Sequence, residues 1–245
     1  MRVQYLPGVI AIASDFPRGP VQRFLRAREE YRPAVPGNGS PAAALAALIH
    51  RYSDHAEVGF GVVVAQEDST VAMPLRVVIE AELTAAELTA GVDTARTDLI
   101  ASSAGFDLDL MIEKLCETPV FDRHPLFQIA YCEVGGRRGI DLDAEQDALD
   151  AVVSCDLVFV ADRGTGELHC EYDSELFEAA TVGRLLSYWA ELIGALTATP
   201  EARIGALPIA PAAEDAPAGG WSAGPLVART ATTVHALIAE QAVRH

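Results

Sequence analysis

The sequence predicts an α/β protein in which helices pack against a mixed sheet. Short runs rich in β-branched residues alternate with longer segments of helical periodicity. Two of the strand-like runs flank the turn-forming stretch "DRGTG", which predicts a hairpin. The chain has 245 residues and is 50% hydrophobic, so it is long enough to bury one substantial core beside a smaller appendage.

The N-terminal part is expected to become regular after residue 40. Residues 1–40 are rich in Pro, Gly and Arg, which predicts an irregular lead-in. The run "AAALAALIHRY" consists of strong helix formers, and Ser40 followed by Pro41 is a typical start for a buried helix. The β-branched runs "AEVGFGVVVA" and "AMPLRVVIEAEL" then predict strands over 56–65 and 72–83.

The middle of the chain is expected to be helical. "TAAELTAGVDTARTDLIASS" predicts a helix over 84–103, and "DLDLMIEKL" predicts a second one over 107–115. In the second helix, four apolar residues recur at helical spacing and share one face: Leu108, Met111, Ile112 and Leu115.

Three further elements complete the predicted layer fold. "PLFQIAYCEV" predicts a strand over 125–134, and the polar, acidic stretch 135–150 that follows it predicts a loop. The hairpin is expected over 151–173, and "LFEAATVGRLLSYWAELIGALTA" predicts a long amphipathic helix over 176–198. The order of elements is that of a mixed α/β fold.

A change in composition divides the chain near residue 210. The stretch "PAAEDAPAGG" (211–220) has the composition of a flexible linker, and "TVHALIAEQAVRH" predicts the start of another helix. We therefore expect one domain over 1–210 and a separate segment over 211–245.

Charge and hydropathy argue against two classes of partner. The formal net charge of −17 disfavours binding to nucleic acid or to an anionic membrane surface, because either would require a basic patch. Lys114 is the only lysine, and no phosphate-binding GxxxxGK[ST] stretch occurs. The longest apolar runs after the lead-in are strand-sized, so no membrane span is predicted.

The four cysteines predict neither a metal site nor disulfides. They lie far apart in the sequence and form no CxxC pair, whereas zinc sites use close ligand pairs. Their neighbours are apolar, which is typical of reduced thiols in the core of a cytoplasmic protein. The four are Cys116, Cys132, Cys155 and Cys170.

Two stretches match H-x-x-x-D, a spacing at which a carboxylate can orient a histidine base. His50 and Asp54 would share a helix face, and His169 and Asp173 would share a strand face. Chance alone predicts ~0.4 such matches in a chain of this composition, and His50 also suits a helix C-terminus. Structural roles are therefore the favoured interpretation for both.

Several strings occur in the order of one known family. These are "ASDFPRGPVQ", "ALAALIHRYS", "MPLRVVI", "FDLDLMIEKL", "RHPLFQIAYCEV" and "LHCEYDSELFEAATVGRLLSYWAELIGAL". Together they resemble the condensation domain of nonribosomal peptide synthetases, which is itself similar to chloramphenicol acetyltransferase. The last stretch, "WSAGPLVARTATTVHALIAEQAVRH", resembles the linker and first helix of a following adenylation domain.

The resemblance implies the C-terminal half of a chloramphenicol acetyltransferase-like fold over 1–210, and the start of an adenylation domain over 211–245. Polar positions of the family's cleft are replaced in this chain, while apolar core positions such as Leu108, Ile112, Phe127 and Ile129 persist. The replacements are Ser103, Ala104 and Gly105 for its "HQD", Val71 and Ala72 for its Asn–Thr, and Pro119 and Val120 for its Arg–Asp.

The family is an acyl or peptidyl transferase, but its catalytic HHxxxDG motif does not occur in this sequence. We therefore expect no enzyme activity from this chain alone. The expected role is a truncated condensation domain that serves as a structural platform in the biosynthesis of peptide secondary metabolites such as antibiotics. No cofactor is expected, because phosphopantetheine would belong to a carrier domain elsewhere.

Two alternatives stay open at this point. The chain could be half of an active condensation or acyltransferase enzyme, either completed by another chain that carries HHxxxDG or using its own His50 or His169. It could also be an α/β fragment without a function of its own.

The resemblance implies an adenylation domain of the same polypeptide as the main partner, with carrier-protein domains as further partners. The linker from about residue 207 to residue 234 would run along the interface with the adenylation domain, held by apolar anchors. For Trp221 an exposed position in the linker is an equal alternative. The candidate anchors are Trp221, Leu226, Val234, Leu237 and Ile238.

Overall fold

The computed structural model of the chain describes residues 12–19, 25–32, 39–65, 70–115, 124–135, 152, 155–211 and 242. The chain divides into two compact units, Met1–Ile209 and Ala210–His245. Nearly all the described residues belong to the first unit, to which the following account refers.

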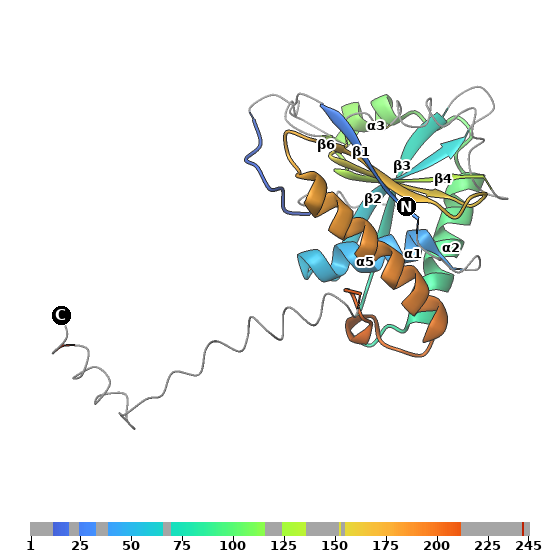
Figure 1. Cartoon of the computed structure of the whole chain (residues 1–245). Coiled ribbons are helices and arrows are strands. Elements are labelled where there is room, and N and C mark those ends of the chain that lie inside the picture. The colour runs from blue at the N-terminus through green and yellow to red at the C-terminus, as the bar shows by residue number, and fades with distance from the viewer. Residues whose placement is uncertain are drawn as a thin grey trace. The chain divides into compact units, whose positions relative to one another are not determined.

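Among these residues, six strands form one mixed sheet in the order β1-β6-β5-β4-β2-β3 (Figure 1). The β2–β4 and β4–β5 pairs are parallel, and the other three pairs are antiparallel. The strands are β1 Arg26–Tyr31, β2 Glu57–Ala65, β3 Thr70–Val78, β4 Ile129–Val134, β5 Leu157–Asp162 and β6 Leu168–Asp173.

The helices begin where the sequence provides side-chain caps. Ser40 precedes α1 and its hydroxyl accepts a hydrogen bond from the Ala43 N–H, while Thr84 and Glu87 form a reciprocal capping box at the start of α2. The described helices are α1 Pro41–Ser53, α2 Ala85–Ala101, α3 Leu108–Leu115, α5 Ala179–Ala198 and the short 3-10 helix η2 Ile204–Ala206.

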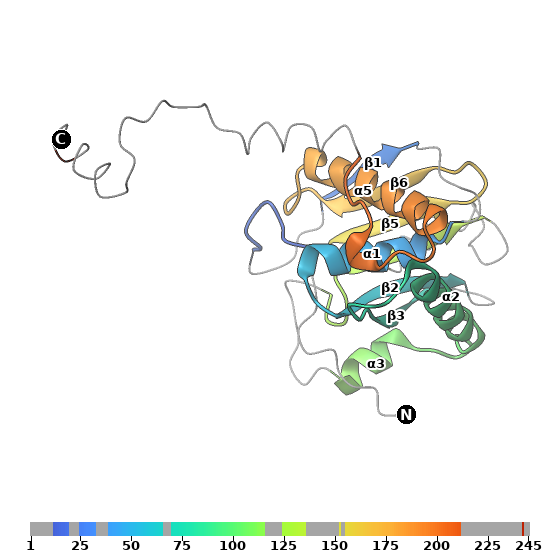
Figure 2. The same ribbon diagram turned by 90° about the horizontal axis from the view of Figure 1, so that it is seen from below.

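The sheet separates two apolar cores. The larger core lies between the sheet and α1, α2 and α5, and the smaller lies on the opposite face, where Leu108 of α3 packs. Figures 1 and 2 show how these helices lie around the sheet. Strand β2 supplies both cores: Val62 faces the larger and Val63 the smaller. A strand covered on both faces is apolar throughout, which explains the continuous run in β2.

Trp189 of α5 is the centre of the larger core. Its side chain is fully buried, and its indole N–H donates a hydrogen bond to the Pro41 carbonyl at 2.9 Å. The ring meets the rings of Phe159 and Tyr131 edge-on, at centroid distances of 5.2 and 6.3 Å. One side chain thus joins α5, α1 and two central strands.

Phe127 of the smaller core lies directly against the backbone of Gly61 in β2. A Cβ atom at residue 61 would lie 2.3 Å from Cε2 of the Phe127 ring, closer than any real contact. Phe127 is 1% exposed and stacks on His124 at a centroid distance of 4.1 Å. The glycine is therefore required for this packing.

The predicted fold class and most of its elements are confirmed. The expected helices over 84–103 and 176–198 correspond to α2 and α5, and the expected hairpin forms across Asp162–Gly166 as β5 and β6. The strand expected over 125–134 begins only at Ile129, because residues 124–128 form a turn that precedes it.

The expectation of an irregular lead-in is wrong for residues 26–31. These residues form β1, an edge strand paired with β6, and only Ala27 packs toward the larger core. Its sequence, "RAREEY", has no apolar periodicity because an edge strand with charged side chains needs little burial. None of the helices in the described ranges is long and apolar enough to cross a membrane.

Candidate functional site

The most organised polar cluster lies at the C-terminal ends of β4 and β5. Glu133 of β4 accepts hydrogen bonds from the hydroxyl of Tyr131 at 2.6 Å and from Arg96 of α2 at 3.3 Å. Arg163, in the turn after β5, lies 3.4 Å from the same carboxylate and donates to the Gly39 carbonyl at 2.8 Å. The side chains of Arg96 and Glu133 are only 4% and 7% exposed.

The two arginines keep the buried carboxylate charged. Burial would raise the pKa of Glu133, but Arg96, the Tyr131 hydroxyl and Arg163 outweigh it and hold that pKa below its ordinary value. Burial and the adjacent carboxylate raise the pKa of Tyr131 well above its usual range. The Arg96 guanidinium also lies over the Tyr131 ring, 5.0 Å from its centroid.

This cluster is suited to holding elements together rather than to proton transfer. Its interactions join α2, β4, the β5–β6 turn and the residue before the cap of α1. The Glu133 carboxylate is neutralised on both sides, so it is a poor base at neutral pH. The sequence did not predict this cluster, although the single Glu inside the apolar run "IAYCEV" indicates a buried charge that needs a partner.

His124 caps the turn that leads into β4. Its Nδ1 accepts hydrogen bonds from the backbone N–H groups of Leu126 and Phe127, both at 3.2 Å. A ring nitrogen that accepts two hydrogen bonds must be unprotonated, and burial lowers the pKa of His124 to about 4. The imidazole acts here as an Asn side chain does in a turn.

The predicted His50–Asp54 pair does not form. Helix α1 ends at Ser53, and Asp54 has a left-handed backbone (φ 56°), so the two residues do not share a helix face. The backbone N–H of Asp54 closes the helix on the His50 carbonyl, while the His50 ring lies 2.7 Å from the carbonyl of His55. His50 therefore belongs to the structure of the helix end.

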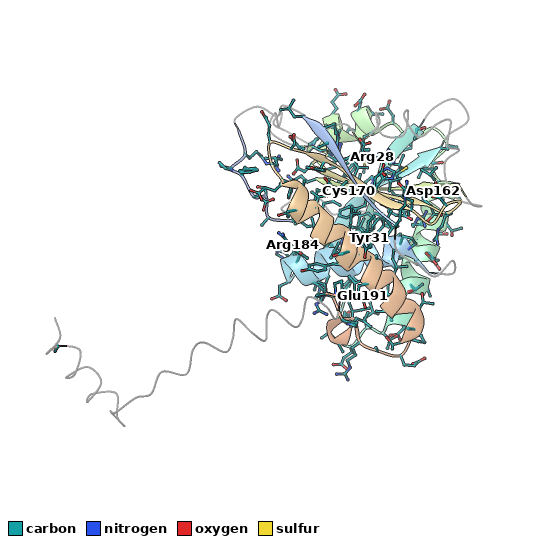
Figure 3. All side chains as sticks on the ribbon, in the orientation of Figure 1. Arg28, Tyr31, Asp162, Cys170, Arg184 and Glu191 are labelled. Carbon is teal, nitrogen blue, oxygen red and sulfur yellow. The ribbon has the colours of Figure 1, made fainter. Side chains whose placement is uncertain are left out.

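His169 is held by groups other than Asp173. Its Nδ1 lies 3.2 Å from a guanidinium nitrogen of Arg28, whereas Asp173 accepts the N–H of Glu175 in the next turn. Figure 3 shows Arg28 on the edge strand β1. Burial lowers the pKa of His169 to about 4, and the Arg28 charge adds to this against the attraction of Asp162. A buried, neutral ring beside an arginine is not poised as a general base.

The thiols in the described part of the chain are structural. Cys132, Cys155 and Cys170 are free and buried, as predicted, and Cys116 lies outside the described residues. Burial raises the pKa of Cys155 and of Cys170, which disfavours the reactive thiolate. No group of His, Cys, Asp or Glu within the described ranges is arranged to hold a metal ion.

Arg51 fastens the segment that ends the first unit, residues 199–209, which we call the closing segment. Its Nη1 donates to the carbonyl oxygens of Ile204, Gly205 and Leu207 at 3.2, 3.0 and 3.0 Å. Ile204 and Leu207 are buried, which anchors the segment from its other side. This role of Arg51 could not be predicted from the sequence, because the carbonyl groups lie about 150 residues away along the chain.

Backbone pairing holds the closing segment to the start of α2. The N–H groups of Ala85 and Ala86 donate to the carbonyls of Ala202 and Pro200 at 2.9 and 2.8 Å, and the Ile204 N–H donates to Leu83 at 3.1 Å. Backbone N–H groups in the first turn of α2, which have no partner within the helix, thereby find acceptors in a distant part of the chain. The candidate anchors Trp221, Leu226, Val234, Leu237 and Ile238 lie outside the described residues and stay predictions.

Comparison with known proteins gives no matching family model. The chain is 27% identical over 247 residues to phosphinothricin tripeptide synthetase PhsC of Streptomyces viridochromogenes, which covers 85% of the chain and 22% of that protein. It is also 36% identical over 93 residues to surfactin synthase subunit 1 of Bacillus subtilis, covering 37% of the chain and 3% of that protein. The chain therefore spans only a small part of these curated relatives.

Three solved structures share the fold at low sequence identity. A four-domain nonribosomal peptide synthetase bound to AMP and glycine matches 84% of the chain and 19% of its own, with a TM-score of 0.69 and 16% identity. A mutant starter condensation domain of rhizomide synthetase matches 82% of the chain and 51% of its own, with a TM-score of 0.58 and 16% identity. The chain has the condensation-domain fold.

The match to about half of an isolated condensation domain confirms the predicted fold class, a mixed α/β sheet with helices of the chloramphenicol acetyltransferase-like type. The same fold is found in the X-domain of teicoplanin biosynthesis, solved in complex with OxyB. That structure matches 82% of the chain and 52% of its own, with a TM-score of 0.65 and 18% identity.

Proposed function

We propose that this condensation-type domain has no catalytic activity of its own and serves as a structural platform for a following adenylation domain in a nonribosomal peptide synthetase. The observation that carries this proposal is the closing segment. It is fixed by Arg51 and by backbone hydrogen bonds to α2, so whatever follows Ile209 is attached to a firmly held point.

The state of three of the four described histidines, all except the exposed His55, supports the absence of catalysis. His124 and His169 are buried and neutral, and His50 contacts a backbone carbonyl at a helix end. The chain contains no adjacent histidine pair. A positioned general base typically accelerates an acyl or peptidyl transfer by about 10²–10⁴-fold. Another group would have to supply this rate enhancement here.

The relatives support a role inside a multidomain assembly. The chain is similar to segments of two large peptide synthetases, and the four-domain synthetase carries the same fold. The X-domain in its complex with OxyB is a precedent for a condensation fold that presents a docking surface. Free buried thiols are typical of proteins in a reducing compartment, which supports the proposal of a cytoplasmic protein.

The test is a deletion in the protein as its gene encodes it. Amino-acid-dependent exchange of pyrophosphate into ATP and the soluble yield would be measured with and without residues 1–210. We expect the deletion to lower both. Full activity and full solubility of the shortened protein would refute the platform role.

A second assay addresses the alternative of a half-enzyme. Carrier-bound aminoacyl substrates would be incubated with the chain alone, and we expect no amide or ester product. If a product forms and His50→Ala or His169→Ala abolishes it, the non-catalytic assignment is wrong. A product that requires a second chain carrying HHxxxDG would support the half-enzyme instead.

A further inference from the structure

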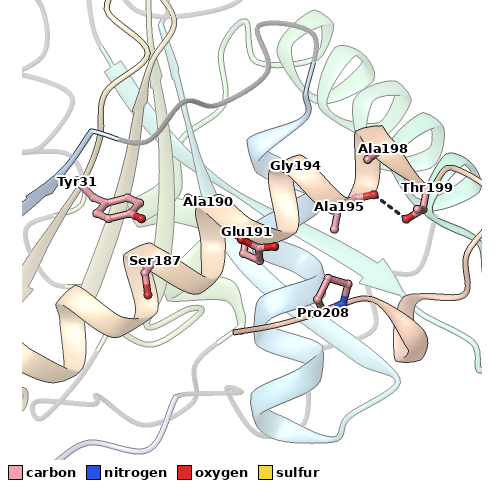
Figure 4. A pocket seen from close by; sticks show the side chains of 9 residues that line it. All are labelled: Tyr31, Ser187, Ala190, Glu191, Gly194, Ala195, Ala198, Thr199 and Pro208. Atoms are coloured by element: carbon pink, nitrogen blue, oxygen red, sulfur yellow. Dashed lines mark hydrogen bonds between the residues drawn. The ribbon is translucent and has the colours of Figure 1, made fainter. Parts of the chain in front are cut away.

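A groove of about 540 Å³ runs along the outer face of α5, between Tyr31 of β1 and Pro208 of the closing segment (Figure 4). Its floor consists of small residues: Ala190, Gly194, Ala195 and Ala198 of α5. Figure 4 shows Tyr31 and Ser187 toward one end, Thr199 and Pro208 toward the other, and Glu191 between them.

Apart from the Tyr31 hydroxyl, which can donate or accept, the polar side chains of this groove present acceptor oxygens. The Ser187 hydroxyl donates its proton to the Arg184 carbonyl at 2.8 Å, and the Thr199 hydroxyl donates to the Ala195 carbonyl at 2.9 Å, so each presents oxygen lone pairs. The Glu191 carboxylate is half-buried and makes no ion pair or hydrogen bond within the described part of the chain. Among the described residues, no cationic side chain lines the groove.

These properties select the chemistry of the occupant. A groove with one carboxylate and several acceptor oxygens fits a group that donates hydrogen bonds and carries a positive charge. Arginine suits it better than lysine, because its planar guanidinium has five N–H groups that can reach several acceptors at once. Ala190, Gly194 and Ala198 are spaced by four residues on one helix face, so a partner backbone can approach closely.

We propose that this groove is a docking site for a helix of a neighbouring protein domain that inserts one arginine beside Glu191. The biological meaning of the site rests on the proposed platform function, whereas its binding chemistry does not. The net charge of −17 adds a long-range preference for basic partners.

The probe is a soluble alanine- and glutamine-based helical peptide with one central arginine, and its control is the same peptide with citrulline, which keeps the shape but lacks the charge. Binding to the full chain would be followed by the backbone amide signals of Ser187, Gly194 and Thr199 in NMR spectra. We expect the arginine peptide to bind about fivefold more tightly, the upper end for a partly exposed ion pair.

Two variants with the same change of charge make the test specific. Glu191→Gln should remove the preference for arginine, while Glu201→Gln, at an exposed position outside the groove, should keep it. Thermal unfolding of both variants checks that the fold is intact. Equal binding of the two peptides, or an equal effect of both variants, would overturn the proposal. If a second copy of the chain occupied the groove instead, the protein would form a concentration-dependent dimer that Glu191→Gln disrupts. That result would also overturn the proposal.

The two proposals can fail separately. If deletion of residues 1–210 impairs adenylation but the arginine peptide is not selected, the platform stands and the groove proposal is wrong. If the peptide is selected through Glu191 while the deletion is harmless, the groove stands and the platform is wrong.

Discussion

Replacing His124 by Asn should make the protein less sensitive to acid. Folding requires a neutral His124 ring, because Nδ1 accepts two backbone hydrogen bonds and the side chain is buried. The pKa of this ring is about 4 in the folded chain against an ordinary value near 6.5. Between these values the unfolded chain binds the proton and the folded chain does not, so acid favours unfolding.

The magnitude follows from this difference in pKa. The stability that depends on neutral His124 is fully present above pH 6.5 and is lost as the pH falls toward 4. At pH 4.5 the loss amounts to about 2–3 kcal/mol of the free energy of unfolding. The Asn side-chain oxygen can accept the same two N–H groups but does not titrate. The variant gives up the stacking on Phe127, so its stability at pH 7.5 should be lower.

The assay is urea unfolding of both proteins at intervals between pH 7.5 and 4.5. The free energy of unfolding of the wild type should fall more steeply than that of His124→Asn, by about 2–3 kcal/mol over this range. His169 contributes a similar slope to both proteins and cancels in the comparison. His55→Asn, at an exposed position, is the control. Parallel curves for wild type and His124→Asn would show that the His124 ring is not held neutral.

Three further outcomes are expected. Phe127→Ala should lower the free energy of unfolding by about 3–5 kcal/mol because the ring is fully buried; unchanged stability in urea would contradict the packing against Gly61. Arg96→Met should lower the free energy of unfolding by about 3–5 kcal/mol, since the buried Glu133 carboxylate loses its main partner. Adding Glu133→Gln should recover part of that loss. Additive losses in a double-mutant cycle would disprove the coupling between the two residues. Residues 221–245 should become protected from hydrogen exchange only when the adenylation domain is present, and equal protection without it would remove support for the linker anchors.

Local chemistry determined the elements that the sequence predicted correctly. Helix α1 follows from Ser40, Pro41 and a run of helix formers, and α2 follows from the Thr84–Glu87 capping box. The hairpin follows from strand-like runs around Asp162–Gly166, where the Asp162 carboxylate accepts the N–H groups of the next turn. These interactions join residues within a few positions of one another, so the sequence alone contains both partners.

The remaining features depend on partners that are distant along the chain. Strand β1 is a strand because β6 pairs with it, about 140 residues later, and its own charged sequence shows no strand periodicity. The H-x-x-x-D spacing of His50 and Asp54 predicts proximity only if the helix continues, and the left-handed turn at Asp54 ends it.

The polar sites were decided by tertiary structure for the same reason. Arg96 and Glu133 lie 37 residues apart, and the three carbonyl groups that bind Arg51 lie more than 150 residues from it. The sequence determined most of the helices and strands, with β1 as an exception, and showed that many of them are apolar. Which charges meet inside was decided only when the sheet brought its strands together, because a buried charge is stable only beside a partner that the fold supplies.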